Sequence, residues 1–407
     1  MAQRFVIIGG GLAGAKAAQA LREKGFDGEL VLIGDEEHQP YERPPLSKDY
    51  LAGKAERQSV FVHAPDWYDE HQVQLRLGVA ATAIDRSVHE VALADGGRIG
   101  YHRLLLATGA SPRRLPVPGA DAAGVHYLRR IGDSEAIRST FGGRLVVIGA
   151  GWIGLEVAAA ARQAGSEVTV VEVAELPLLA VLGPEIATVF ADLHRGQGVD
   201  LRLATQLTEV VTDGGRATGV RLADGTVIDA DAVVIGVGIR PNTELAEAAG
   251  LTVDNGVVVD ASLRSSDNDV FAAGDVANAL HPLLGRHIRV EHWANALNQP
   301  ATAAAAMLGG TEPYDELPYF YTDQYDLGME YIGYVEPRGY DRVVVRGDAA
   351  AREFVAFWLD AQSRVLAGMN VNVWDVVDPI KAIIRAGRPV DPDRLADPDT
   401  PLEGIGS

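Results

Sequence analysis

The sequence contains no cysteine among its 407 residues. A chain without thiols forms no disulfide framework, no thiolate zinc site and no protein-ligated iron–sulfur cluster. It also has no cysteine nucleophile and no redox-active dithiol. Any redox chemistry that this protein performs must therefore use a bound cofactor.

Basic residues are few: 36 Lys and Arg stand against 56 Asp and Glu, which gives a formal net charge of −20. This balance argues against a nucleic-acid partner and against binding to an anionic membrane surface. Long apolar runs are also missing, since none reaches the roughly 18 residues needed to span a bilayer. The chain leads directly from Arg4 into a strand pattern, so we expect no signal peptide, no membrane insertion and a cytoplasmic protein. A monomer and a homodimer both fit this composition.

Glycine, by contrast, is abundant, and part of it marks an internal repeat. The first copy is a strand, a GxGxxG turn, an alanine-rich helix and a second strand leading to two acids: 5–8, 9–14, 15–24, 30–33, and Asp35 with Glu36. The second copy repeats this order: 144–148, 149–154, 155–164, 167–171 and Glu172. Two copies in the same strand–turn–helix context are strong evidence for two dinucleotide-binding folds.

Each GxGxxG turn has a physical reason in phosphate binding. The first glycine permits a tight turn, the second lets a pyrophosphate approach the backbone, and the third lets the helix and strand pack closely. The helix N-terminus then offers unpaired N–H groups and a partial positive charge. The acid after the second strand accepts hydrogen bonds from a ribose.

A second repeated element closes each fold. Asp-Gly turns at 95–96 and 224–225 predict hairpins, and each hairpin precedes a buried strand, 104–106 or 232–235, that leads to a proline. We interpret the prolines as crossings between domains. The pattern therefore predicts a second dinucleotide-binding domain, residues 110–235, inserted into a first one made of residues 1–109 and 236–312.

The last part of the chain, residues 313–407, differs in kind. Its apolar runs predict a meander of three strands: 343–347, 354–358 and 365–369. A helix is expected over 376–386, and an extended segment over 389–401. The predicted fold class is α/β, with two Rossmann-like domains, one inserted in the other, and a small α+β C-terminal domain.

Residues 270–276 resemble the third flavin motif of flavoprotein reductases with two dinucleotide-binding domains, which share a glutathione reductase-like architecture. In that family the aspartate, here Asp275, contacts the ribityl chain of the flavin. The resemblance implies that FAD binds to the N-terminal site and that NAD binds to the inserted domain. It also implies that the C-terminal domain helps to cover the flavin.

Four further segments resemble a narrower group, the ferredoxin reductases of bacterial cytochrome P450 and aromatic-ring dioxygenase systems: 40–48, 153–156, 291–296 and 321–325. This resemblance extends over nearly the whole chain. It implies a flavoprotein that takes hydride from NADH onto FAD and passes single electrons to a [2Fe–2S] ferredoxin. The protein then supplies orientation and electrostatics, while the cofactor supplies the chemistry.

The same resemblance implies three catalytic residues, Lys48, Glu156 and Arg43. In the family the acid matching Glu156 lies near the nicotinamide and pairs with the lysine matching Lys48; the alternative is a plain helix-surface acid. Arg43 is expected to stabilise charge on the reduced flavin, or else to pair with Glu42 on a surface loop.

Two aromatic residues, Trp293 and Tyr321, are expected from the resemblance to flank the flavin ring, whereas the pattern alone favours a place in the core. The full set of expected cofactor-binding residues is Gly9, Gly11, Leu12, Ala13, Gly14, Asp35, Glu36, Arg43, Pro44, Lys48, Ala81, Ala107, Thr108, Gly109, Arg129, Gly149, Gly151, Trp152, Ile153, Gly154, Glu172, Gly238, Gly274, Asp275, Glu291, His292, Trp293 and Tyr321.

Glu172 favours NADH over NADPH, because its carboxylate would bond the adenosine ribose hydroxyls and repel a 2′-phosphate. Residues 163–194 contain neither Lys nor Arg, so this stretch offers no basic partner for that phosphate. Relatives often carry arginines near positions 178–182, and this departure implies a modest affinity for the nicotinamide cofactor.

Other functions stay open on the sequence alone. The acceptor can instead be rubredoxin, a quinone or monodehydroascorbate, although an acidic C-terminal tail does not favour quinone reduction at a membrane. A redox-sensing binding protein similar to apoptosis-inducing factor is a non-enzymatic alternative, which would favour long insertions or a basic nucleic-acid face.

Two surface features complete the expectations. Ferredoxins are acidic, so docking would need a local basic patch, for which the candidates are Arg286, Arg289, Lys381 and Arg385. The spacing of His281, His287 and His292 does not match a metal motif. We therefore predict no metal site and interpret these histidines as surface or cleft residues.

Overall fold

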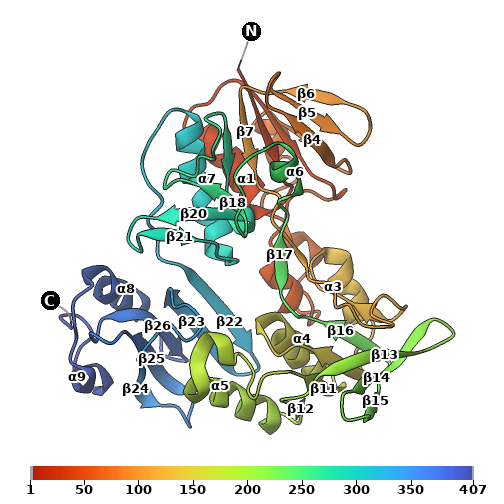
Figure 1. The fold of residues 1–407 in the computed structure, drawn as a ribbon, viewed down its shortest axis with the longest axis vertical. Helices are drawn as coiled ribbons and strands as arrows, with labels where there is room; N and C mark the ends of the chain where they lie inside the picture. The colour runs from red at the N-terminus through yellow and green to blue at the C-terminus, as the bar shows by residue number, and fades with distance from the viewer. Residues whose placement is uncertain (1–2, 406–407) are drawn as a thin grey trace. The chain divides into compact units, whose positions relative to one another are not determined.

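The computed structural model describes residues 3–405, which divide into two compact units (Figure 1). The first unit consists of residues 3–43, 57–111 and 239–318, and the second of residues 44–56, 112–238 and 319–405. Neither unit is a continuous stretch of chain. Each contains one parallel sheet built from one copy of the internal repeat.

The parallel sheet of the first unit has five strands: β1 (Arg4–Ile8), β2 (Glu29–Ile33), β3 (Val73–Arg76), β7 (Arg103–Leu106) and β19 (Val270–Ala272). Their order is β3-β2-β1-β7-β19, and helix α1 (Leu12–Glu23) connects β1 to β2. The apolar runs that predicted β1, β2 and β7 reflect burial on both faces of a parallel sheet. These three predicted strands are confirmed, β3 and β19 were not predicted, and α1 begins three residues before the predicted helix.

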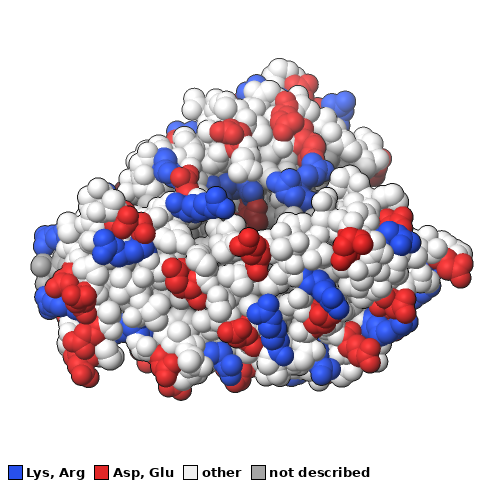
Figure 2. Space-filling model, turned by 60° about the horizontal axis from the view of Figure 1, so that its bottom comes forward, with Lys and Arg blue, Asp and Glu red and all other residues white. Residues whose placement is uncertain are grey.

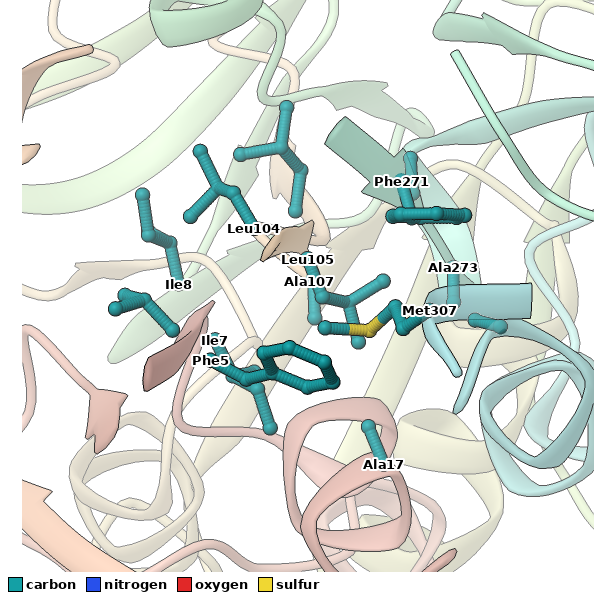
Figure 3. Close-up of a cluster of buried hydrophobic side chains, with 14 of the residues drawn as sticks. Phe5, Ile7, Ile8, Ala17, Leu104, Leu105, Ala107, Phe271, Ala273 and Met307 are labelled. Atoms are coloured by element: carbon teal, nitrogen blue, oxygen red, sulfur yellow. The ribbon is translucent and has the colours of Figure 1, made fainter. Parts of the chain in front are cut away.

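The core of this unit lies between the sheet and two alanine-rich helices, α1 and α7 (Trp293–Met307). Ala17 on α1 and Ala303 on α7 are fully buried, and such small side chains let the two helices pack closely. Figure 3 shows Phe5, Phe271 and Met307 meeting in this core. The glycine turn after β1 is therefore held by a rigid, tightly packed layer.

Smaller elements complete the first unit. They are the antiparallel sheet of β4 (Ala81–Asp85), β5 (Glu90–Leu93) and β6 (Arg98–Gly100), the sheet of β18 (Val257–Val259), β20 (Ala277–His281) and β21 (Arg286–Ile288), the pair β8 (Ala110–Pro112) and β17 (Ile239–Pro241), helices α2 (Trp67–Glu70) and α6 (Glu244–Ala248), and 3₁₀ turns η2 (Arg57–Val60) and η3 (Gly274–Val276). The hairpin predicted at 95–96 is confirmed, since β5 and β6 pair across it.

The parallel sheet of the second unit repeats the first. Its strands are β10 (Arg144–Ile148), β11 (Glu167–Val171), β12 (Asp200–Arg202), β16 (Ala232–Ile235) and β9 (Val125–His126), in the order β12-β11-β10-β16-β9. Helix α4 (Trp152–Gln163) connects β10 to β11 as α1 connects β1 to β2. The predicted internal repeat is therefore confirmed at the level of topology. One difference concerns the outermost strand next to β16 or β7. In the second unit this strand, β9, precedes β10 in the sequence, whereas in the first unit the corresponding strand, β19, follows β7.

Further elements of the second unit accompany this sheet. They are η1 (Pro44–Ser47), α3 (Ile131–Arg138), α5 (Leu179–Gly196) and the antiparallel sheet of β13 (Leu207–Asp213), β14 (Arg216–Leu222) and β15 (Val227–Asp229). The hairpin predicted at 224–225 is confirmed by the pairing of β14 with β15. Helix α5 is kinked at Gly183, because this residue has a non-helical φ of 78° and the next residue is Pro184.

An antiparallel sheet of five strands forms the C-terminal part of the second unit. The strands are β22 (Tyr319–Gln324), β23 (Leu327–Gly333), β24 (Arg342–Asp348), β25 (Glu353–Leu359) and β26 (Val365–Val371), in the order β22-β23-β26-β25-β24. The predicted meander, β24 to β26, is confirmed. Strand β22 was missed because its buried positions include the polar Thr322 and Gln324, which hide the usual apolar alternation.

The chain ends with two helices, α8 (Val377–Ala386) and α9 (Pro392–Ala396). The first confirms the predicted helix. The second corrects the expectation of an extended segment over 389–401. Asp391 caps α9 by accepting a hydrogen bond from the backbone N–H of Asp393, and Pro392 occupies the first helical position. The local sequence Asp-Pro is therefore a helix start rather than an extended run.

Charged side chains of both signs are interspersed over the face shown in Figure 2. Among residues 3–405, no helix combines the length and apolar character that crossing a bilayer requires.

Candidate functional site

The two GxGxxG turns have the same stereochemistry. A Cβ atom at Gly9 (φ +132°) would lie 2.0 Å from the carbonyl oxygen of Ala107, and one at Gly14 would lie 2.0 Å from the carbonyl oxygen of Gly9. In the second turn, a Cβ at Gly149 (φ +99°) or Gly154 would lie within 2.4 Å of a backbone oxygen. The first and third glycines are thus required by the fold itself.

The middle glycines, Gly11 and Gly151, differ because a Cβ there would meet no heavy atom of the described chain within 4 Å. Each is the extended N-cap residue of its helix, α1 or α4. The first-turn N–H groups of these helices therefore lie next to open space that a side chain would fill. Both turns fit a pyrophosphate, and the residues at their helix starts are Leu12, Ala13, Trp152 and Ile153.

The third flavin motif lies against the first glycine turn. A Cβ at Gly274 would be 3.1 Å from the Cβ of Ala13, although some 260 residues separate the two in sequence. The Gly274 N–H donates a 2.8 Å hydrogen bond to Oε1 of Gln299, a buried side chain on α7. Asp275 follows in η3. Gln299 is a residue that sequence reasoning missed, since a glutamine in an alanine-rich helix carries no pattern.

The loop after β7 is fixed by Asn242. The Thr108 hydroxyl donates to the Asn242 carbonyl oxygen, and the Asn242 amide donates to the Thr108 carbonyl oxygen, both at 2.8 Å. The Asn242 N–H also donates to the carbonyl oxygen of Gly109 at 2.9 Å. These bonds hold Ala107, Thr108 and Gly109 beside the Gly9 turn. Asn242 was also missed by sequence reasoning.

The acid and the arginine expected near FAD contact each other. The Tyr41 hydroxyl donates to Oε2 of Glu36 at 2.7 Å, and Nη2 of Arg43 lies 3.6 Å from Oε1 of Glu36. The neighbouring Glu42 accepts a 2.9 Å hydrogen bond from the indole N–H of Trp293. Arg43 thus forms an ion pair with Glu36, while Glu42 fixes the indole at the start of α7.

Residues 291–293 lie at the N-terminus of α7, with His292 as the N-cap residue. Burial lowers the pKa of His292 to about 4 against a smaller opposing effect of Asp275, so this imidazole is neutral at pH 7. Glu291 forms a 2.6 Å ion pair with Arg289, whose side chain is only 8% exposed. The expectation that Arg289 belongs to an exposed basic patch is therefore wrong, because its guanidinium is buried against its own unit.

The acid of the second fold, Glu172, closes its own glycine turn. Its Oε2 accepts a 2.7 Å hydrogen bond from the N–H of Ala150, and its Oε1 accepts a 2.9 Å bond from the N–H of Ala174. The next residue, Val173, is 69% exposed. Glu172 thus keeps its carboxylate at the mouth of the turn, in the position where a ribose-binding acid is expected.

Lys48 and Glu156 form a buried ion pair with 2.6 Å between Nζ and Oε1. The same carboxylate accepts hydrogen bonds at 2.5 Å from the hydroxyls of Ser47 and Thr322. Glu156 is 5% exposed, so the alternative of a helix-surface acid is wrong. Three donors compensate for the lost hydration of this carboxylate. Ser47 and Thr322 lie within the segments that resemble ferredoxin reductases, but the sequence pattern alone indicates no role for either hydroxyl.

One aromatic ring lies over this ion pair, and others pack at the start of α4. The Lys48 ammonium lies 5.4 Å from the ring centroid of Tyr321, a cation–π distance. Trp152 makes edge contacts with Phe190 and Phe320. Burial raises the pKa of the nearby Asp323, and the Lys48 charge partly opposes this rise. The side chains at the end of η1, on α4 and on β22 thus form one cluster around Glu156.

The remaining expected residues come from several further elements of the two units. Their places are Asp35 in the exposed turn after β2, Pro44 at the start of η1, Ala81 at the start of β4, Arg129 just before α3, and Gly238 between β16 and β17. The N–H of Arg129 donates to Oδ2 of Asp133 at 2.9 Å, which fixes the start of α3.

Within the described part of the chain, His, Asp and Glu side chains do not gather in groups of three or more suited to a metal ion. His281 is 3% exposed and lies 3.0 Å, through Nε2, from the carbonyl oxygen of Glu316. His281 is therefore buried at the end of β20, and its interpretation as a surface residue is wrong.

Comparison with known proteins settles the family. Residues 3–300 match the family described as pyridine nucleotide-disulphide oxidoreductase. The chain belongs to this family. Residues 319–405 match a second family, described as reductase C-terminal. This membership confirms the prediction of an oxidoreductase that uses FAD and NAD(H).

Individual relatives match the chain over nearly its full length. The ferredoxin–NAD(+) reductase component of the anthranilate 1,2-dioxygenase system of Burkholderia cepacia is 42% identical over 405 residues, covering 99% of both chains. Putidaredoxin reductase CamA of Pseudomonas putida is 44% identical over 408 residues, covering 98% of this chain and 96% of the relative. The solved covalent putidaredoxin reductase–putidaredoxin complex matches with a TM-score of 0.93 and 41% identity, covering 98% and 97% of the two chains. The predicted fold class and the resemblance to ferredoxin reductases are confirmed.

Proposed function

We propose that this protein is an FAD-dependent NADH–ferredoxin reductase that supplies a [2Fe–2S] ferredoxin, and through it a cytochrome P450 or a Rieske-type oxygenase. The observation that carries the proposal is the full-length match to relatives named as ferredoxin reductases, at 42 to 44% identity. The family is named for disulphide chemistry, yet this chain has no cysteine. Electrons must therefore leave the flavin for an acceptor outside the chain.

FAD would be held by residues of the first glycine turn and the segments fixed around it: Gly9, Gly11, Leu12, Ala13, Gly14, Glu36, Thr108, Gly109, Gly274 and Asp275. The open space beside Gly11 and the packing of Gly274 on Ala13 support this assignment. NAD(H) would be held by the second turn, Gly149 to Gly154, and by Glu172. When bound, FAD accepts two electrons as hydride and releases them one at a time.

Lys48 and Glu156 are the proposed catalytic pair on the nicotinamide side. Their charges are fixed in place by Ser47 and Thr322, so the orientation of both groups is set before a substrate arrives. Arg43 is proposed to stabilise negative charge on the reduced flavin, and its link to Glu36 and Tyr41 holds it on its loop. The aromatic rings of Trp293 and Tyr321 are proposed to flank the flavin.

The proposed cofactor preference is NADH. Support comes from Glu172, whose carboxylate stays at the mouth of the second turn, and from the lack of Lys and Arg over residues 163–194. We further propose three domains: FAD-binding (1–109 and 236–312), NAD-binding (110–235) and C-terminal (313–407). A cytoplasmic location is proposed because NADH is supplied there.

The test is electron transfer from NADH to defined acceptors by the purified yellow protein. Stopped-flow absorbance follows flavin bleaching first, and then reduction of several [2Fe–2S] ferredoxins, with a rubredoxin and a soluble quinone as parallel acceptors. We expect at least one ferredoxin to be reduced about tenfold faster than the other acceptors. The proposal fails if NADH bleaches the flavin rapidly while every ferredoxin is reduced no faster than the quinone.

A further inference from the structure

A chain of buried hydrogen bonds runs from the Glu156 carboxylate to helix α5. The Thr322 hydroxyl donates to Oε1 of Glu156 at 2.5 Å, and the Gln324 amide nitrogen donates to Oγ1 of Thr322 at 3.3 Å. Oε1 of Gln324 lies 2.8 Å from Nε2 of His194, and Nδ1 of His194 lies 3.4 Å from the Tyr325 hydroxyl. Figure 1 shows α5, which carries His194, beside β22, which carries Thr322 and Gln324.

The chemistry of each group fixes the direction of every bond in this chain. A carboxylate only accepts, so the Thr322 proton points to Glu156, and the Thr322 oxygen accepts from the Gln324 amide. The Gln324 carbonyl oxygen then faces His194, whose Nε2 must carry the proton. Nδ1 is left as an acceptor for the Tyr325 hydroxyl. Because burial lowers the pKa of His194 to about 4, its imidazole is neutral, as this arrangement requires.

This chain of hydrogen bonds is deeply buried, since Thr322 and Gln324 are 1% exposed and His194 is fully buried. Leaving a buried polar group without its partner costs about 1–3 kcal/mol of folding free energy, so the hydrogen-bonded side chains depend on one another. A break at His194 would free the Gln324 amide to turn its carbonyl oxygen toward Thr322, where this oxygen would compete with Glu156 for the proton of the Thr322 hydroxyl.

We propose that His194 and Gln324 are positioning residues for hydride transfer, which act by directing Thr322 onto the carboxylate of Glu156 and so fixing the Lys48–Glu156 pair. The inference rests on the proposed function of that pair. The hydrogen bonds of His194 reach the Glu156 carboxylate in three steps, through Gln324 and Thr322. The sequence offers no reason to single out this histidine.

The experiment compares His194→Leu, which removes the donor, with His194→Gln, which keeps an N–H donor near the position of Nε2. Gln324→Met interrupts the chain of hydrogen bonds at a second point, and this variant provides the test if His194→Leu does not fold. Ser166→Ala is the matched control, because its fully buried hydroxyl oxygen accepts a 2.9 Å bond from the N–H of Gly142 in the same unit, outside the chain.

Stopped-flow measurement of flavin bleaching gives the rate at saturating NADH and the NADH dissociation constant separately. We expect His194→Leu and Gln324→Met to bleach about tenfold more slowly, with the dissociation constant changed by less than about threefold. His194→Gln should recover to within about threefold of the parent rate, and Ser166→Ala should bleach at the parent rate.

Parent rates in His194→Leu or Gln324→Met would overturn the inference, as would a His194→Gln variant no faster than His194→Leu. An equal slowing in Ser166→Ala would also overturn it, because the effect would then follow any loss of a buried bond. Glu156→Gln distinguishes a failure of the proposed role of the Lys48–Glu156 pair from a failure of the inference about His194. If Glu156→Gln bleaches at the parent rate, the proposed role of the Lys48–Glu156 pair fails; if it is slow while His194→Leu is not, only this inference fails.

Discussion

Lys48 and Glu156 lie 108 positions apart in the sequence, yet their charged atoms are 2.6 Å apart in the fold. Lys48 follows a short 3₁₀ turn, and Glu156 occupies the second turn of the helix that begins at the NAD-type glycine motif. A buried pair of this kind is sensitive to the loss of one partner, because the other charge is left in a poorly hydrated place.

The first prediction concerns the stability of this pair. Lys48→Met should lower the free energy of unfolding by about 2–3 kcal/mol, and the double variant Lys48→Met/Glu156→Gln should recover at least about 1 kcal/mol of it. Chemical unfolding followed by circular dichroism measures both. Arg221→Met is the control, since Arg221 pairs with Glu209 at 2.6 Å on the surface. This substitution should lower the free energy of unfolding by less than about 1 kcal/mol. A double variant less stable than Lys48→Met would contradict the argument.

A second prediction separates the roles of two glycines in the second turn. Gly151→Ala adds a methyl group where the described chain leaves open space, so the thermal midpoint should be unchanged while KM for NADH rises about tenfold. Gly154→Ala would place its Cβ 2.1 Å from the carbonyl oxygen of Gly149 and should lower the thermal midpoint instead. Steady-state kinetics and thermal denaturation distinguish the two. Normal NADH binding by Gly151→Ala would remove this turn as the pyrophosphate site.

The third prediction concerns the choice between NADH and NADPH. Val173 is exposed directly after Glu172, so Val173→Arg adds a positive charge without disturbing the bonds of the Glu172 carboxylate. We expect the parent protein to prefer NADH by about 100-fold in kcat/KM, and Val173→Arg to reduce that preference about tenfold through KM for NADPH. Val227→Arg, on the exposed face of β15, is the matched control for added charge. A parent protein that prefers NADPH would show the assignment of Glu172 to be wrong.

The fourth prediction follows from the buried His194. Its pKa is lowered to about 4 in the folded chain, below the value of about 6.5 expected when unfolded, so the unfolded state takes up the proton first. Stability from this group is complete above pH 6.5 and is lost as the pH falls toward 4, with roughly 2 kcal/mol lost by pH 5. His194→Gln should show a correspondingly flatter decline between pH 7 and pH 5. Chemical unfolding at several pH values measures the difference, and parallel curves for the two proteins would contradict it.

Most of the regular structure was predictable because its signals are local. The two glycine turns, their flanking strands and the last three strands of the C-terminal sheet follow from apolar runs and turn residues that lie next to one another in the sequence. Strand β22 was not predictable in this way, because Thr322 and Gln324 are buried for their hydrogen bonds rather than for their apolar surface. Helix α9 was missed because an Asp-Pro pair signals both a turn and a helix start.

The sequence by itself determined the two dinucleotide folds, the need for an outside electron acceptor and the acid expected in each fold. These features depend on composition or on neighbours a few residues apart. The tertiary structure alone decided that Glu156 is buried among Lys48, Ser47 and Thr322, that Glu42 binds Trp293, and that Arg289 is buried and unsuited to an exposed patch. Such pairings join segments more than a hundred residues apart or depend on burial, and only packing brings their polar groups close enough to replace lost water.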